Sequence, residues 1–538
     1  MSKPGRRVAI LGAGVSGLAS IKSCLEEGLE PICFEQRREI GGMWSGVDES
    51  LTGCAPQPYK SLVTNSSKEM TCFSDYPFPK EVPTYMPMKL VRKYLNSYAE
   101  HFNLKPYIQL ETKIIQVSKA RDYDESGKWD IAIEDSNGRR HTEIVHAVIV
   151  CTGVCVKPRY PTIEGMVCFK GKIEHSISFT GGEAYKDRNI VVVGNSFSAG
   201  DIAVAVCDHA NEVHLSVGNG CHVLRRFDEK GRPTDTQLLK RVYKSKWMAP
   251  FYEGVRWRIS NMTLNHKRVG ILPKTPSSSI GTYMLNDEIT LKIMSGKVKV
   301  VDRVVSLGEN EARLEGGREI QDVDVLIFAT GYERDFPFLD KEIVEPTETS
   351  DEGKLNWYKM VFPVELPHHT LAMVGFVSSD GSHTPLYELQ SRLAARVIAG
   401  NHKLPAKETM MADIDKWNSF LKTKYSFYKY QVPYVQFQDE IAAEIGVKPN
   451  FWELLWKNPR LAFLCQFDTA FPFQFRLAGP HKNERAIEWC YEARENTFSG
   501  IQHRIVPLTS SGFALPIDMN ILRLVLVGTL AVCLYTLA

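Results

Sequence analysis

Apolar residues near the start of the chain fall into two short runs with a helical stretch between them. Residues 8–11 form the first run and lead directly into a glycine-rich turn, after which residues 18–25 have the length of a short helix. The second run, residues 31–34, ends at Glu35. Short apolar runs bounded by turn residues are typical of buried strands. The pattern therefore predicts a strand–helix–strand unit.

The turn after the first run has the spacing G-x-G-x-x-G, with Glu35 about twenty residues further on. In this context the spacing predicts a dinucleotide site, because the glycines allow a tight turn, close approach of a pyrophosphate to the helix N-terminus, and close helix–strand packing. Glu35 is expected to accept hydrogen bonds from a ribose. The residues predicted to bind this cofactor are Gly12, Ala13, Gly14, Val15, Ser16, Gly17 and Glu35.

A second strand–turn–helix–strand pattern begins near residue 190 and returns at residues 213–217. Its turn has Ser196 at the middle glycine position, where a side chain would crowd a pyrophosphate. We predict that a second dinucleotide binds here and exchanges, whereas the first is held tightly. The alternative is a strand–helix–strand core without a ligand. The residues predicted to bind here are Gly194, Asn195, Ser196, Phe197, Ser198 and Ala199.

Further strands are predicted along the rest of the chain, at residues 114–117, 129–133, 147–150, 298–305, 312–314 and 325–328. The strands that end at Thr152-Gly153 and Thr330-Gly331 are expected where the chain passes between the two units. Residues 225–286 are basic and aromatic. Because their charges do not fall on one helical stripe, we expect a solvated insertion and not a nucleic-acid surface.

Composition limits the function classes without naming a chemistry. The 538 residues are 43% hydrophobic and 24% charged, which is ordinary for a globular protein of roughly three domains. A net charge of +2 gives no reason to expect nucleic acid. The twelve cysteines are scattered, which favours a reducing compartment, and Cys151 and Cys155 are expected to be structural. A strand that begins at Val8 leaves no room for a signal peptide.

Several motifs together resemble the flavin-containing monooxygenases, the dimethylaniline N-oxide-forming family of class B, vertebrate-like type. Residues 169–179 match F-x-G-x-x-x-H-x-x-x-Y/F and end at Phe179, where the related Baeyer–Villiger enzymes typically have Trp. The resemblance covers almost the whole chain. The other matching elements are the first glycine turn, Glu35, Gly41-Gly42-Met43-Trp44, Thr64-Asn65-Ser66-Ser67-Lys68, Asn286-Asp287-Glu288, Phe328-Ala329-Thr330-Gly331-Tyr332 and Glu388-Leu389-Gln390.

The resemblance implies FAD on the first unit and NADPH on the second, with NADH possible. Reduced flavin would capture O₂ as a C4a-hydroperoxide and pass one oxygen to a small nitrogen or sulfur nucleophile, or insert it beside a carbonyl. Asn65 is the candidate catalytic residue, because an amide donates and accepts hydrogen bonds without adding a proton source. No metal is expected. The remaining residues expected at the cofactors are Gly42, Met43, Trp44, Thr64, Asn65, Ser66, Ser67, Thr330, Gly331 and Gln390.

Two departures from the family pattern concern the second site. The family usually has G-x-G-N-S-G there, and after the returning strand it usually has an arginine for the 2′-phosphate of NADPH, where this chain has Gly218. Either Arg225 or Arg226 serves instead, or the preference for NADPH is weakened. Arginine at position 218 is then expected to lower the Michaelis constant for NADPH and not for NADH. Two alternatives stay open: an uncoupled NAD(P)H oxidase that releases hydrogen peroxide, and a flavin-binding scaffold without activity.

The predicted fold is α/β, with two Rossmann-like dinucleotide-binding domains and the smaller NADP domain inserted in the FAD domain. Residues 524–538 carry no charge but are shorter than the roughly 20 that span a bilayer. The resemblance implies a tail that binds membrane lipid at the endoplasmic reticulum, catalytic domains that face the cytosol, and a role in xenobiotic metabolism. The predicted boundaries are 1–156 and 331–445 for the FAD domain, 157–330 for the NADP domain with a divergent insertion at about 225–285, 446–515 for a helical substrate-access region, and 516–538 for the tail.

Overall fold

The computed structural model describes residues 5–503 apart from gaps at 48–54, 57, 245–247, 249, 253, 256–257, 260–263, 275–282, 341–342, 344–355 and 425–430. Its first sheet is wholly parallel, with the strand order β22-β7-β1-β2-β3. The predicted strands at residues 8–11, 31–34 and 147–150 are confirmed. The strands are β1 (Arg7–Leu11), β2 (Glu30–Phe34), β3 (Ile108–Gln109), β7 (Ala147–Val150) and β22 (Leu371–Met373).

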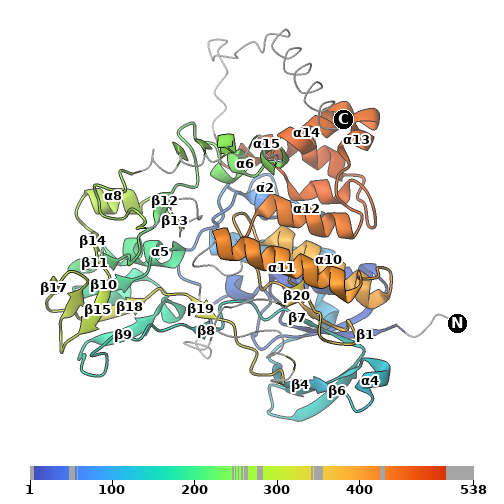
Figure 1. The fold of residues 1–538 in the computed structure, drawn as a ribbon, viewed down its shortest axis with the longest axis horizontal. Coiled ribbons are helices and arrows are strands. Elements are labelled where there is room, and N and C mark those ends of the chain that lie inside the picture. Colours follow the sequence, from blue (N-terminus) through green and yellow to red (C-terminus); the bar gives the residue numbers. More distant parts are fainter. Residues whose placement is uncertain are drawn as a thin grey trace, which may run out of the picture. The chain divides into compact units, whose positions relative to one another are not determined.

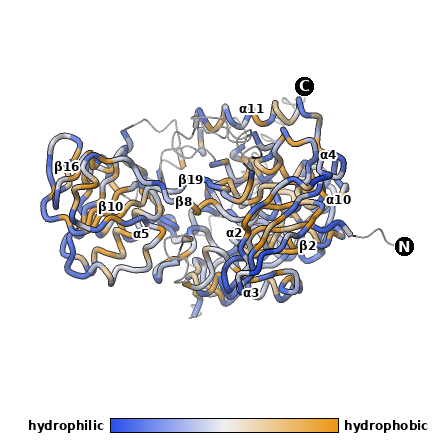
Figure 2. The backbone as a smooth tube through the Cα atoms, turned by 90° about the horizontal axis from the view of Figure 1, so that it is seen from below, coloured by the Kyte–Doolittle hydropathy of each residue, from blue (hydrophilic) through white to orange (hydrophobic). Residues whose placement is uncertain are grey.

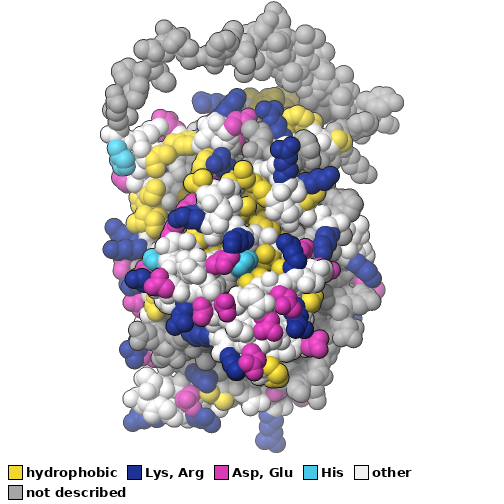
Figure 3. Space-filling model, turned by 90° about the vertical axis from the view of Figure 1, so that its left-hand side faces the viewer, with side chains coloured by type: hydrophobic (Ala, Val, Ile, Leu, Met, Phe, Trp, Pro, Cys, Tyr) yellow, Lys and Arg dark blue, Asp and Glu magenta, His cyan; other side chains and the backbone are white. Residues whose placement is uncertain are grey.

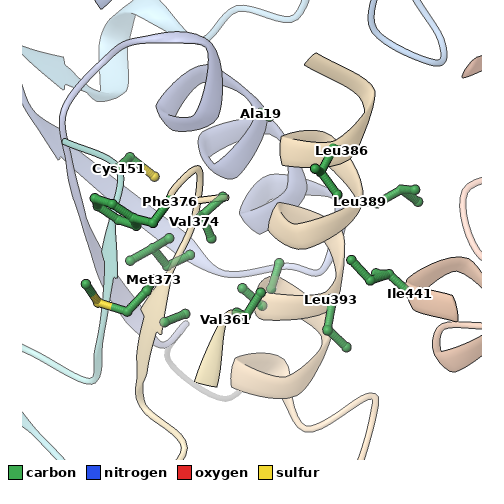
Figure 4. Packing of buried hydrophobic residues seen from close by; sticks show 14 of the residues in the cluster. Ala19, Cys151, Val361, Met373, Val374, Phe376, Leu386, Leu389, Leu393 and Ile441 are labelled. Carbon is green, nitrogen blue, oxygen red and sulfur yellow. The ribbon is translucent and has the colours of Figure 1, made fainter. Parts of the chain in front are cut away.

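Helix α1 (Val15–Glu26) packs on this sheet, and the long helix α10 (Thr384–Ala399) packs on α1. Leu386, Leu389 and Leu393 recur every three or four residues, so they lie on one face of α10. All three are buried, and Figure 4 shows them beside Ala19 of α1 and Ile441. Burying one such leucine stabilises the fold by about 2 kcal/mol.

The second sheet is also parallel, in the order β14-β11-β10-β18-β9, and helix α5 (Phe197–Val206) packs on it. Figure 1 shows it in green and yellow at the left, and Figure 2 shows the apolar course of β10 inside this unit. Two dinucleotide-type parallel sheets confirm the predicted α/β class. The strands are β9 (Lys172–His175), β10 (Asn189–Val193), β11 (Glu212–Ser216), β14 (Lys299–Val301) and β18 (Val325–Phe328).

The apolar stretch 298–305 belongs to two different sheets. Its first part is β14, and its second part is β15 (Val304–Leu307), which joins an antiparallel sheet with β16 (Ala312–Leu314) and β17 (Glu319–Ile320). Asp302 and Arg303 lie at the break between the two strands.

The strands of the second sheet lie between two strands of the first sheet in the sequence, because β7 precedes them and its partner β22 follows them. The chain leaves the first sheet through β8 (Lys157–Pro158) and returns through β19 (Tyr332–Glu333), and these two short strands pair with each other in antiparallel fashion. The second unit has its own buried clusters, formed by residues 163–329. Both connections between the units therefore pass through one point.

The remaining elements surround these sheets. An antiparallel sheet contains β4 (Lys113–Lys119), β5 (Trp129–Glu134) and β6 (Arg140–Val145), and four two-residue strands are β20 (Trp357–Tyr358), β21 (Phe362–Pro363), β23 (Ser378–Ser379) and β24 (Gln431–Val432). A parallel pair contains β12 (His222–Leu224) and β13 (Tyr283–Leu285). The helices are α2 (Lys68–Thr71), α3 (Met88–His101), α4 (Tyr123–Ser126), α6 (Thr234–Leu238), α8 (Ile289–Met294), α11 (Lys407–Lys424), α12 (Tyr434–Glu444), α13 (Phe451–Lys457), α14 (Pro459–Phe467) and α15 (Ala486–Ser499).

The predicted hydrophobic tail lies outside the described residues, which end at residue 503. Within the described part of the chain, no helix combines the length and the apolar character that crossing a bilayer requires.

Candidate functional site

The first glycine turn has the shape that its sequence predicts. Gly12 has a φ of 102°, and a Cβ on Gly17 would lie 1.9 Å from the Gly12 carbonyl oxygen, so the fold itself requires glycine at both positions. Gly14 differs, because a Cβ there would meet nothing nearer than the Gly42 Cα, at 3.6 Å. Such a contact is ordinary van der Waals packing, so the fold itself does not require glycine there, as expected if its role is to let a ligand approach the backbone.

The N-terminus of α1 begins at this turn and has no side-chain cap, since its N-cap residue is Gly14. The first N–H groups of the helix, on Val15, Ser16 and Gly17, have no partner within the helix and are free to bind an anion. The turn also contacts the predicted loop at Gly42, Met43 and Trp44, because the Gly41 N–H donates to the Ala13 carbonyl at 3.0 Å. The residues present fit a dinucleotide pyrophosphate.

Glu35 lies beneath the same turn. Its carboxylate accepts hydrogen bonds from the backbone N–H groups of Ala13 (2.7 Å) and Arg37 (2.9 Å). Burial raises the pKa of Glu35, and these hydrogen bonds oppose that shift. Each oxygen keeps a lone pair that can accept from a ribose hydroxyl, as the sequence predicts.

The second glycine turn keeps the backbone form of the first despite its serine. A Cβ on Gly194 would lie 2.4 Å from the Ala329 carbonyl oxygen, so glycine is required there. Ser196 is the N-cap of α5 in an extended conformation (φ −124°, ψ −164°), which any residue adopts. Its hydroxyl donates to the Tyr283 carbonyl at 3.3 Å. Of the other predicted residues, Asn195 donates to the Gly220 carbonyl, Phe197 is exposed, Ser198 is half-buried and Ala199 is buried.

Two side chains of residues 225–286 hold the predicted segment Thr64, Asn65, Ser66 and Ser67. The Asn65 Oδ1 accepts a hydrogen bond from Arg226 Nη2 at 2.8 Å. The N–H and the hydroxyl of Ser67 both donate to Asp235 Oδ2, at 2.7 and 3.0 Å. Thr64 and Ser66 are fixed by bonds within their own unit, to Met86 and Thr71.

Arg226 connects this segment to the end of β13. Its Nη1 pairs with Asp287 Oδ2 at 2.8 Å, and its Nε donates to the Thr64 carbonyl at 3.1 Å. A parallel connection joins Tyr59 to Asp201 on α5 at 2.5 Å, and Asp201 also accepts from the Asn286 amide. The motif Asn286-Asp287 thus takes part in both of these side-chain contacts.

The expectation that residues 225–286 form a solvated insertion is wrong for several of its charged residues. Arg226 is mostly buried, and Arg241 is buried in an ion pair with Asp439 at 3.1 Å. Asp235 is buried as well, which raises its pKa to about 6. A segment that carries buried ion pairs has no one-sided charge pattern, so periodicity could not detect them.

Thr330 and Gly331 lie where the two connections meet. The Thr330 hydroxyl donates to the Arg159 carbonyl at 2.5 Å. His175, from the motif at residues 169–179, bonds through Nε2 to the Gly331 carbonyl at 3.0 Å, while its Nδ1 accepts from the Ile177 N–H. Burial lowers the pKa of His175, so the ring is neutral with its hydrogen on Nε2. The motif therefore stabilises the connection between the two sheets.

Gln390 is fully buried behind the first turn. Its amide accepts from the Gly375 N–H and donates to the carbonyls of Lys359 and Met360, all at 3.3 Å. A Cβ on Gly375 would lie 3.0 Å from the Ser16 hydroxyl. Gln390 thus positions backbone that contacts the turn, and its own polar atoms bond to protein.

Other chemistries find little support in the part of the chain that the structure describes. No group of three or more His, Cys, Asp or Glu side chains is suited to a metal ion there. The described cysteines are free thiols, Cys151 and Cys155 among them. On the face seen in Figure 3, basic and acidic side chains are interspersed and form no single basic patch.

The family model described as flavin-binding monooxygenase-like matches residues 5–535. The chain belongs to this family. Flavin-containing monooxygenase 1 of Homo sapiens is 36% identical over 519 residues, which cover 94% of this chain and 96% of that protein. Flavin-containing monooxygenase 2 of the same organism is 35% identical over 536 residues, covering 98% and 99%. Flavin-containing monooxygenases are oxidoreductases, so the predicted enzyme class is confirmed.

Solved structures support the fold of this flavin-containing monooxygenase. The S-allyl-L-cysteine S-oxygenase of Allium sativum matches with a TM-score of 0.62 and 23% identity, and the match covers 92% of this chain and 100% of that chain. Cyclohexanone monooxygenase of Rhodococcus, solved with NADP⁺ bound, matches with a TM-score of 0.56 and 13% identity over 82% and 98%. At these identities the likeness concerns the fold.

Within this family member, Arg226 does not replace the arginine that is missing at position 218. Its guanidinium is already occupied by Asp287, Thr64 and Asn65. Arg225 directly follows β12, and its guanidinium lies over the Phe227 ring, 5.5 Å from the ring centroid. Of the two arginines that the sequence offers for a 2′-phosphate, Arg226 is therefore already committed to protein partners, and a weakened preference for NADPH stays open.

Proposed function

We propose that the chain is an NADPH- and O₂-dependent monooxygenase that transfers one oxygen atom to soft nitrogen or sulfur nucleophiles of small molecules, xenobiotics among them, or inserts it beside a carbonyl. FAD would bind at the first turn and NADPH at the second. Bound flavin would supply the redox chemistry with O₂ that side chains lack. The observation that carries the proposal is the Asn65 amide, which belongs to the first unit and is oriented by Arg226 of the second.

The orientation of Asn65 follows from its partner. A guanidinium only donates hydrogen bonds, so the amide must turn Oδ1 toward Arg226. Its Nδ2 is then directed elsewhere and can donate to a cofactor or to bound substrate. Because an amide does not titrate, this donor has no proton to lose near neutral pH. The residue can therefore hold a reactive group without protonating it.

Two aromatic side chains pack against each other where the two units meet. Phe179 is buried and meets Tyr59 edge-on, with ring centroids 5.8 Å apart. Tyr59 is fixed in turn by Asp201. This aromatic pair fixes the junction, whereas the exposed Asn65 amide would be screened from water by bound cofactor and substrate.

The proposal is tested by stoichiometry. The full-length, FAD-loaded protein is mixed with NADPH in air, with a dialkyl sulfide or a tertiary amine, and NADPH consumption, oxygenated product and hydrogen peroxide are measured together. We expect product to match NADPH consumed. Asn65→Ala should divert consumption into peroxide, whereas Asn137→Ala, at an exposed turn, should not. Product without NADPH, or no consumption by protein that holds FAD, would overturn the proposal.

The second candidate is an NAD(P)H oxidase that releases peroxide without oxygenating substrate. Phe197, the first residue of α5, is 41% exposed beside Ser196 at the second turn. Bulk at that position favours weak retention of the coenzyme, and a site that loses its coenzyme early admits water. Peroxide that equals NADPH consumption with every substrate offered would favour this candidate.

We also propose that residues 524–538 attach the protein to the endoplasmic reticulum membrane with its catalytic domains in the cytosol. The stretch is uncharged. On α13, Trp452 and Trp456 are exposed, at 53% and 89%, and tryptophan favours the interface of a bilayer. Leu526→Glu with Leu530→Glu should release the protein from isolated membranes. Retention of the doubly substituted protein, or recovery of the natural protein in the supernatant, would overturn this proposal.

A further inference from the structure

The second turn lacks the acidic residue that marks the ribose end of the first. In the first unit, the Gly12 N–H donates to the last carbonyl of β2 at 2.8 Å, and Glu35 comes next in sequence. In the second unit, the Gly194 N–H donates to the last carbonyl of β11 at 3.0 Å, so Val217 occupies the position of Glu35. A 2′-hydroxyl finds no carboxylate at this position, and a 2′-phosphate meets no negative charge there.

A cation reaches this position from the neighbouring strand. β14 runs parallel to β11 and ends level with it, Ser216 opposite Val301. Arg303 follows β14 by two residues, at the same edge of the sheet. Its Nη2 lies 2.7 Å from the Asn219 Oδ1 and 3.4 Å from the place that a Cβ on Gly218 would take. The guanidinium thus lies directly over the glycine.

The other cations around this loop are already paired. Lys274 forms an ion pair with Glu315 at 2.7 Å, and Arg318 forms one with Asp302 at 2.8 Å. Arg303 is exposed, and among the described residues no carboxylate lies within ion-pair distance of it. It is therefore the base at this edge whose charge is available to a ligand.

We propose that Arg303 binds the 2′-phosphate of NADPH and thereby sets the preference for NADPH over NADH. This inference rests on the proposed function, since it requires NADP at the second turn. A guanidinium presents a planar fork of donors that matches a phosphate. The absence of a side chain at Gly218 leaves the room in which that fork lies. The arginine expected after β11 is thus supplied by the strand beside it.

Direct binding tests the assignment without turnover. The full-length, FAD-loaded protein is titrated by calorimetry with 2′,5′-ADP and with 5′-AMP, which differ in the 2′-phosphate. Arg303→Gln should weaken 2′,5′-ADP by about tenfold, the size of one charge-assisted hydrogen bond, and should leave 5′-AMP within about twofold. Arg303→Lys should lie between. Arg313→Gln should change neither, because Arg313 is an exposed arginine of β16 that pairs with Glu319 of β17.

Three other results would each overturn the assignment of Arg303 to the 2′-phosphate. If Arg303→Gln binds 2′,5′-ADP as tightly as the natural protein does, the phosphate is held elsewhere, while the proposed function stands. Equal weakening of both nucleotides would mean a general disturbance of the loop, and the melting temperature of the FAD-loaded variant would show it. If the natural protein does not bind NADP⁺ at all, the proposed function fails and this inference fails with it.

Discussion

Replacing Arg226 with glutamine tests the connection on which the candidate site depends. The side chain of Arg226 is 11% exposed and that of Asp287 is 21% exposed. Arg226→Gln leaves the Asp287 carboxylate without its cation and removes the donors to Asn65 and the Thr64 carbonyl. Breaking a buried pair by removing one partner costs about 3–5 kcal/mol, and partial exposure places this one at about 3 kcal/mol.

The functional effect should exceed what lost stability explains. Without its donor the Asn65 amide can rotate, so we expect product formed per NADPH consumed to fall by about tenfold, with peroxide as the difference. The assay measures sulfoxide, peroxide and NADPH in the same sample, well below the melting temperature of the variant. Arg258→Gln is the matched control, because it removes an exposed arginine from its pair with the exposed Glu229 in the same segment and should cost at most about 0.5 kcal/mol.

Two results would refute this reasoning. If Arg226→Gln lowers the melting temperature but leaves the ratio of product to NADPH unchanged, the orientation of Asn65 does not matter to the reaction. If neither stability nor the ratio changes, the ion pair with Asp287 contributes nothing in solution.

Three further predictions concern other parts of the molecule. Burial raises the pKa of Asp235 to about 6 from its usual 3.8, so the folded state binds this proton more tightly than the unfolded state does. The stabilisation of the natural protein by this proton is lost as the pH rises through 6, so the stability of Asp235→Asn relative to the natural protein should increase by about 1 kcal/mol from pH 5 to 7.5. Parallel pH profiles of the two melting temperatures would contradict this. His175→Ala removes the bonds to the Gly331 carbonyl and from the Ile177 N–H, so unfolding should become easier by about 2 kcal/mol and hydrogen exchange at the connection faster; unchanged exchange would assign the motif another role. Gly218→Arg must adopt a φ near 55° close to the Arg303 guanidinium, so we expect a loss of about 1 kcal/mol of stability and no tighter binding of NADP⁺, whereas tighter binding would restore the expectation from the sequence.

Local patterns predicted the elements that depend on neighbouring residues. The spacing of Gly12, Gly14 and Gly17 after an apolar run was sufficient to predict the first turn, because its geometry is encoded within ten residues. The second turn was predicted as well. The side chain of Ser196 was expected to crowd a ligand, and the backbone itself accommodates serine there in an extended conformation.

Contacts between distant residues could not be predicted in this way. Nothing near Asn65 indicates that its partner is Arg226, because only the folded chain brings β12 beside that segment. The stretch 298–305 shows the same limit, since two short apolar runs with Asp302 and Arg303 between them give no sign that they join different sheets. The charge at that break is visible in the sequence, but its position over Gly218 is not.

The pairing of β22 with β7 also has a consequence for biosynthesis. The edge strand Leu371–Met373 closes the first sheet only after the entire second unit has been translated. Until then Val148, Ile149 and Val150 form an apolar edge without a partner, whereas the second unit is contiguous and can fold as it leaves the ribosome. Long-range parallel pairing of this kind forms late and is exposed to aggregation. A chain interrupted before Leu371 should therefore be a target for chaperones and proteases, however well its inner unit has folded.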